Sequence, residues 1–150
     1  MSNVDTVKVA GLSGVIADQL NEGKEVSFVV TGVSMLPLFV GGRDSVVLSP
    51  IESIKRGKIV YYRRQNGDYV LHRVYRVKGD DIYVVGDNQT TLEKIHSSQV
   101  LGEVTSFVRK GINHTLKECW YKTYVFWVTR LLKSRGKLYK LMSKINRGKV

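Results

Sequence analysis

Short runs of residues with high β-propensity, separated by turn signals, dominate the middle of the sequence. Val, Ile, Tyr and Phe fill these runs, and Gly, Asn or Asp residues stand between them. Asn66 and Gly67 are typical of a type I′ hairpin turn, because both residue types accept a positive φ. The expected strands cover residues 26–31, 44–48, 58–64, 69–78, 81–85 and 100–108, with a second hairpin pairing 74–78 with 82–85. So many short strands predict a mainly β fold, a small and strongly bent antiparallel β-domain.

Helical periodicity flanks this β-domain on both sides. Apolar residues recur at helical spacing through residues 4–22 and stop at Gly23, which predicts an N-terminal helix. After Gly111 the spacing becomes helical again, and it resumes beyond Gly136. The apolar faces carry Trp120, Tyr124, Trp127 and Leu131 in the first of these stretches, and Leu138, Leu141, Met142 and Ile145 in the second. We therefore divide the chain into an N-terminal helix (residues 1–25), a β-domain (26–108) and a basic amphipathic helical tail (109–150).

The positive charge of the chain is concentrated in this tail. Residues 1–108 hold 12 Lys or Arg and 12 Asp or Glu, whereas residues 109–150 hold 12 Lys or Arg and one acid, Glu118. A helical tail of this kind is often only a solvated helix packed on the core. With its Trp and Tyr residues, however, the segment 111–147 also suits an anionic membrane surface. Nucleic acid is the less favoured anionic partner, because about 25 residues before the β-domain leave no room for a helix-turn-helix domain.

Neither a secretory signal nor a membrane span is visible in the sequence. The N-terminal residues lack the basic start and the apolar stretch of about 7–15 residues that a signal peptide needs. The longest unbroken apolar run, residues 124–128, is far shorter than the roughly 20 residues that cross a bilayer. We therefore expect a protein that is cytoplasmic or attached peripherally to a membrane. The single cysteine, Cys119, has no second cysteine beside it, so we predict no disulfide, metal site or cofactor.

A serine, a histidine and two carboxylic acids offer the residue types of a serine-nucleophile site. Ser34 stands in a turn after an apolar run, and a serine hydroxyl becomes nucleophilic when a base takes its proton. His72 shares a face of its expected strand with two valines, where an imidazole would be partly desolvated, whereas His96 and His114 lie in polar or basic segments. Asp87 and Glu93 follow as possible orienting acids. A plain turn between strands would use the same residue types without any chemistry.

Four segments, in order, resemble the boxes of the signal peptidase and LexA-like serine peptidase clan: TGVSMLP, YVLHRVYRV, VVGDNQ and VLGEV. The resemblance covers about residues 26–108. It is greatest to the archaeal and endoplasmic-reticulum signal peptidases, which use His where the bacterial enzymes use Lys. It implies a serine endopeptidase that cleaves a precursor or exported peptide through an acyl-enzyme.

The resemblance also implies roles for single residues. Ser34 would be the nucleophile, and His72 would be a general base that titrates near neutrality unaided. The backbone N–H of Ser34 would stabilise the oxyanion, and Gly32, Met35 and Pro37 would belong to the same loop. Some signal peptidases place a serine donor at the position of Gly32, so the second oxyanion donor is not identified here. Asp87 would support the architecture of the site, and Glu93 is nearest to the acid of the His-type enzymes. Which of the two acids orients the base stays open.

Two other functions remain compatible with these motifs. A LexA- or UmuD-like regulator cleaves its own chain at an Ala-Gly or similar bond, and Ala10–Gly11 lies upstream of Ser34. Those proteins use a Lys base, however, and a longer separation from the nucleophile. A binding module that kept the fold and lost activity would explain the unidentified acid and oxyanion donor.

Overall fold

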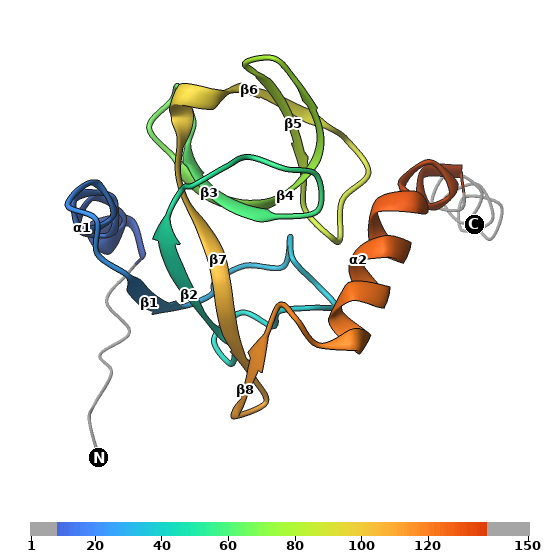
Figure 1. The fold of residues 1–150 in the computed structure, drawn as a ribbon, viewed down its shortest axis with the longest axis horizontal. Coiled ribbons are helices and arrows are strands. Elements are labelled where there is room, and N and C mark those ends of the chain that lie inside the picture. Colours follow the sequence, from blue (N-terminus) through green and yellow to red (C-terminus); the bar gives the residue numbers. More distant parts are fainter. Residues whose placement is uncertain (1–8, 138–150) are drawn as a thin grey trace, which may run out of the picture.

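The computed structural model describes residues 9–137 and shows a curved antiparallel sheet with a helix near each end of the chain (Figure 1). The mainly β fold predicted from the sequence is confirmed. In chain order the elements are α1 (Val9–Asn21), β1 (Val26–Val29), β2 (Ser45–Pro50), β3 (Ile59–Arg63), β4 (Tyr69–Lys78), β5 (Asp81–Val85), β6 (Glu93–His96), a 3₁₀ turn (Ser97–Gln99), β7 (Val100–Arg109), β8 (Ile112–Thr115) and α2 (Cys119–Arg130).

The eight strands form one sheet in the order β1-β2-β7-β3-β4-β5-β6, with β8 paired to β7. The register shifts within β2–β7, β3–β7 and β4–β5, and such irregularities bend strands and increase their twist. The bending is visible in Figure 1, where β3, β4, β5 and β6 curl around one another in the upper half of the molecule. The lower half holds β1, β2, β8 and much of β7.

Both predicted hairpins form, but the first uses a different turn. β3 and β4 are joined through Asn66 and Gly67, and of these two only Gly67 has a positive φ, 94°. The N–H of Gly67 donates to the carbonyl oxygen of Arg64, and the side chain of Asn66 accepts from the N–H of Asp68. This is a turn with a single left-handed glycine, so the type I′ assignment was wrong. The second hairpin pairs Val77 with Ile82, as expected.

Two hydrophobic clusters fill the two halves of the fold. One joins α1, the segment that follows β1, β2, β7 and Tyr121 of α2. The other lies inside the curl of β3 to β6. Successive residues of a strand face opposite sides, so β4 contributes Tyr69 and Leu71 to the first cluster and Val70 and Val74 to the second. This arrangement places β4 at the centre of the candidate site.

The ends of the chain differ in detail from the sequence prediction. The N-terminal helix begins at Val9 in the structure, and the predicted residues 4–8 lie outside the described range. Residues 112–115, expected to belong to the helical tail, instead form β8, and the helix starts only at Cys119. The second amphipathic stretch of the tail, residues 138–147, also lies outside the described residues. No helix within residues 9–137 is long and apolar enough to cross a membrane.

Candidate active site

The loop that carries Ser34 is held by apolar side chains that point into the core. Met35, Leu38 and Phe39 are buried, whereas Ser34 itself is half-buried and Pro37 is exposed. The peptide bond between Leu36 and Pro37 is cis. Because three buried residues anchor the segment, the hydroxyl-bearing residue is fixed in place at the edge of the core.

The Gly-Gly-Arg-Asp segment, residues 41–44, closes this loop. A Cβ on Gly41 would lie 2.6 Å from the backbone oxygen of Gly32, so the two glycines allow the backbones to pack directly. The buried carboxylate of Asp44 accepts from the N–H of Val40 and from Arg43, which lowers the pKa of Asp44 to about 2. Gly32 has a φ of 77°, a conformation that disfavours a side chain. A serine oxyanion donor at this position would therefore be strained.

The Gly-Asp-Asn segment, residues 86–88, holds the loop of Ser34 from the other side. The N–H of Asn88 donates to the backbone oxygen of Ser34 at 2.9 Å, and its side-chain amide donates to the oxygen of Val33 at 3.3 Å. Gly86 packs so closely on the Ser34 oxygen that a Cβ there would overlap it. The first and third sequence motifs are therefore in direct contact through their backbones.

The side chain of Asp87 forms a buried ion pair with Arg73. Nε and Nη2 of Arg73 donate to the two carboxylate oxygens at 2.7 and 2.8 Å, and the hydroxyl of Tyr124 donates to Oδ2 at 2.8 Å. Arg73, only 1% exposed, also donates to the backbone oxygen of Gly57 and to the hydroxyl of Tyr121. Burial by itself would lower the pKa of Arg73, but the charge and hydrogen bonds of Asp87 raise it. Asp87 therefore anchors Arg73 and α2.

His72 lies on the opposite face of β4, inside the apolar curl. It is 3% exposed, and its Nδ1 lies 3.2 Å from the hydroxyl of Tyr62. That hydroxyl donates to Glu93 at 2.8 Å, and Nε and Nη2 of Arg64 hold Glu93 at 2.8 Å each. Burial lowers the pKa of His72 to about 4, although the charge of Glu93 opposes the shift. The expectation that His72 titrates near neutrality was therefore wrong, because its surroundings are desolvated.

A cavity of about 130 Å³ connects the loop of Ser34 to β4. Its walls are formed by Ser34 and Met35, by Phe28 and the residues after β1, and by residues 69–71 of β4. His72 is the next residue of the same strand. No hydrogen bond within residues 9–137 joins the Ser34 hydroxyl to His72, and catalytic hydrogen bonds often tighten only when substrate is bound. The structure thus places Ser34 across a cavity from the β4 residues that immediately precede His72.

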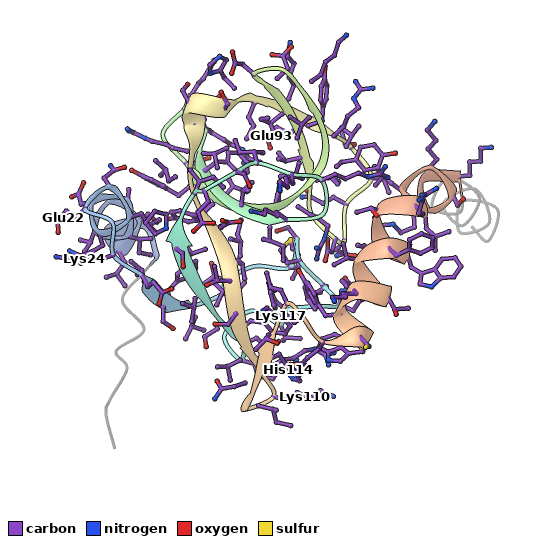
Figure 2. All side chains as sticks on the ribbon, in the orientation of Figure 1. Glu22, Lys24, Glu93, Lys110, His114 and Lys117 are labelled. Atoms are coloured by element: carbon purple, nitrogen blue, oxygen red, sulfur yellow. The ribbon has the colours of Figure 1, made fainter. Side chains whose placement is uncertain are left out.

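The other two histidines have local partners at separate places in the fold. His96 caps the 3₁₀ turn through Ser98. His114 lies 2.9 Å from Glu118 near β8, and Figure 2 shows it at the opposite end of the molecule from Glu93. Cys119 is a free, exposed thiol at the start of α2. Within the described part of the chain, no three His, Cys, Asp or Glu side chains gather closely enough to hold a metal ion.

The aromatic residues of α2 have different environments, although we expected the Trp and Tyr residues of the tail to face a membrane together. Tyr121 is buried in the core, and Tyr124 donates its hydroxyl to Asp87. Phe126 and Trp127 remain 51% and 53% exposed, and their rings contact each other. Tyr121 and Tyr124, which we expected to face a membrane, thus contact the buried Arg73–Asp87 pair instead.

Residues 13–105 match the family model described as Peptidase S24-like. The chain belongs to the Peptidase S24-like family. The matched range contains Ser34, His72, Asp87 and Glu93, and it stops before β8 and α2. A search of the curated proteins finds no match. Family membership supports a serine peptidase-like or LexA- and UmuD-like fold. The hydrogen bonds of Tyr121 with Arg73, and of Tyr124 and Arg135 with Asp87, come from outside the matched range.

Replacement of Asp87 by Asn should destabilise the protein strongly. The change would leave the Arg73 guanidinium buried without its counter-charge, which typically costs about 3–5 kcal/mol. Urea unfolding followed by circular dichroism measures the loss. Asp81→Asn is the matched control, because Asp81 pairs with Lys94 on the surface, where ion pairs contribute little. Equal stability of the two variants would contradict a structural role for the buried pair.

Replacement of Gly86 by Ala should displace the loop of Ser34. The added methyl group would overlap the Ser34 backbone oxygen, and relief of such overpacking costs about 1–3 kcal/mol. Gly14→Ala is the control, since a Cβ there has open space in α1. Thermal unfolding and the amide NMR signals of residues 33–35 and 88 check the expectation. Unshifted signals in Gly86→Ala would show that the two loops are not packed as described.

Proposed function

We propose that the chain is a serine endopeptidase of the signal peptidase type, which cleaves a precursor or exported peptide through an acyl-enzyme on Ser34 with His72 as general base. One observation carries the proposal. A small cavity has Ser34 in its wall and β4 residues that lead directly into His72. The S24-like family membership supports the peptidase class. The signal peptidase type and the Ser–His pair rest on the motifs and on this geometry.

Within residues 9–137, two strand edges that pair with no other strand border the cavity, and they suit an extended peptide. β1 stands at one end of the sheet and pairs only with β2 within the described residues. Residues 69–72 of β4 pair with β3, whereas β5 begins to pair only at Arg73. A substrate strand could therefore bond its backbone to these edges, the usual mode of β-augmentation. A cavity of about 130 Å³ then admits a small side chain next to the scissile bond.

The proposed reaction uses the groups already described. His72 accepts the proton of the Ser34 hydroxyl as its oxygen attacks the scissile carbonyl. The oxyanion of the tetrahedral intermediate accepts a hydrogen bond from the Ser34 N–H. His72 then gives its proton to the leaving amine, and an acyl-enzyme remains on Ser34. Water, deprotonated by His72, hydrolyses this ester and regenerates the serine.

A LexA- or UmuD-like self-cleaving regulator is the second candidate, favoured by the S24-like match. Its suggested bond, Ala10–Gly11, lies within the helical range of α1. A scissile segment must be extended to pair with strand edges, so α1 would have to unwind first. We therefore rank cleavage of a separate peptide first. A binding module of the same fold is the outcome if no cleavage occurs.

The exposed end of α2 supports peripheral attachment to an anionic membrane. Phe126 and Trp127 project two large apolar rings into solvent, and the Arg130 guanidinium lies over the ring of Phe126. Interfacial helices combine such rings with cations that match lipid headgroups. We propose that the segment 111–147 binds anionic lipid rather than nucleic acid, and that this brings the Ser34 site close to membrane-proximal peptides.

Peptide cleavage should depend on both Ser34 and His72. The wild-type chain, incubated with a peptide library rich in small residues, should give products that Ser34→Ala and His72→Ala do not, because removal of nucleophile or base lowers rates by about 10³-fold or more. Mass spectrometry reads the products and the intact chain together. Loss of residues 1–10 without peptide cleavage would favour the self-cleaving regulator. An absence of all Ser34-dependent cleavage would favour the binding module.

Vesicle binding should depend on the aromatic end of α2. Phe126→Ala and Trp127→Ala should each weaken binding to vesicles of anionic phospholipid about tenfold, since each removes an aromatic side chain worth about 1.5–3 kcal/mol when buried. Val15→Ala is the control, because Val15 is equally exposed but lies on α1. Co-sedimentation measures binding. Equal binding by all variants, or tighter binding to duplex DNA than to vesicles, would contradict a lipid-facing α2.

A further inference from the structure

Tyr62 connects Glu93 to His72 because of the register of two strands. β3 and β4 pair Val60 with His72 and Tyr62 with Val70, so Tyr62 and His72 are diagonal neighbours on the same face. Their ring centroids are 6.1 Å apart. The curl of the sheet brings Glu93, the first residue of β6, over the same face, and Figure 2 shows it among the side chains within the curl of β3 to β6.

The hydrogen bonds of this group define where each proton lies. An ionised carboxylate only accepts, and the Arg64 guanidinium beside Glu93 lowers the pKa of that carboxyl group. The single hydroxyl hydrogen of Tyr62 therefore goes to Glu93, over 2.8 Å. The Tyr62 oxygen can then only accept from His72, so the proton of the neutral imidazole must lie on Nδ1. This tautomer leaves Nε2 with a free lone pair.

The same chain of hydrogen bonds stabilises the positive charge that forms on His72 when it accepts a proton. The imidazole is almost fully buried, and an imidazolium there would otherwise lack a counter-charge. Four groups act on its charge: Tyr62 from β3, Arg64 after β3, Glu93 from β6 and Asp87 after β5. Asp87 is bonded to Arg73 and Tyr124, whereas Glu93 reaches the ring through Tyr62. Glu93 is therefore the acid that the hydrogen-bond network couples to the base.

We propose that Tyr62 is a positioning residue, which transmits the charge of Glu93 to His72 and holds the imidazole in the tautomer that a general base needs. The inference rests on the proposed function, because it assigns His72 as that base. It adds a buried tyrosine between the base and its acid, in place of a direct contact between the two. Arg64 completes the chain by holding both oxygens of Glu93.

The experiment compares wild type with Tyr62→Phe and Glu93→Gln. The first readout is ¹⁵N NMR of histidine-labelled protein at pH 7, with His72→Gln to assign the signals. Wild type should show a protonated Nδ1 and an unprotonated Nε2 on His72. Tyr62→Phe removes the acceptor of that proton and should shift the signals towards a mixture of tautomers. An Nε2-protonated ring in wild type, or unchanged signals in Tyr62→Phe, would overturn the proposal.

The second readout is the rate at which a fluorophosphonate labels Ser34 as a function of pH. The labelling rate of the wild type should fall only when the pH drops through about 4, the pKa of His72, because the protonated imidazole cannot act as a base. Glu93→Gln removes the negative charge that raises this pKa, so the midpoint should move to lower pH. Both variants should label about 10- to 100-fold more slowly at pH 7, because base catalysis is impaired. Labelling at the wild-type rate, with the wild-type midpoint, would overturn the coupling.

Ile82→Val separates positioning from simple packing. Ile82 belongs to the hydrophobic cluster that includes Tyr62, but it forms no part of the hydrogen-bonded chain. This variant should melt at a lower temperature and keep the tautomer, the labelling rate and the midpoint of wild type. If Ile82→Val and Tyr62→Phe change the tautomer, the labelling rate and the midpoint equally, Tyr62 only packs in the core. If wild-type Ser34 is not labelled at any pH, the proposed function fails, and the tautomer alone decides whether Tyr62 positions His72.

Discussion

The buried ion pair between Arg73 and Asp87 is the interaction on which the rest of the site depends. A guanidinium removed from water must be matched in charge and hydrogen bonding, and Asp87 supplies both. In satisfying Arg73, Asp87 fixes the loop of residues 86–88, and this loop holds the backbone of Ser34. The hydroxyl of Tyr124 bonds to the same carboxylate, and Arg135 donates to the Asp87 backbone oxygen. One charge pair therefore joins β4, the serine loop and α2.

β4 presents two different environments on its two faces. Arg73 points to the side where α2 covers it, and His72 points into the curl of β3 to β6. Consecutive residues of a strand face opposite sides, so a single His-Arg dipeptide supplies both the candidate base and the structural cation. This division also explains why two nearby acids have different partners: Asp87 pairs with Arg73, and Glu93 reaches His72 through Tyr62.

Much of the fold followed from local patterns. Turn residues and period-two alternation predicted most strands within a few residues, and β4 and β5 to the residue. The short β6 and β8 were missed, because four residues such as Glu93–His96 carry little alternation of their own. The turn at Gly67 differed from prediction, since Asn66 bonds through its side chain instead of adopting a positive φ. Tyr62 was also overlooked, although its place two residues past the partner of His72 was a usable signal.

The sequence by itself indicated which residues were candidates for chemistry, and it placed His72 on the strand that became β4. Ser34, His72, Asp87 and Glu93 were recognised from short motifs and from the order of these motifs along the chain. Only the tertiary structure decided how the two acids divide between Arg73 and His72, because that depends on the curl of the sheet and the packing of α2. It also decided the ionisation of His72, whose pKa of about 4 reflects burial among residues distant in sequence. Desolvation arises from all the surrounding chain, so no short motif can encode it.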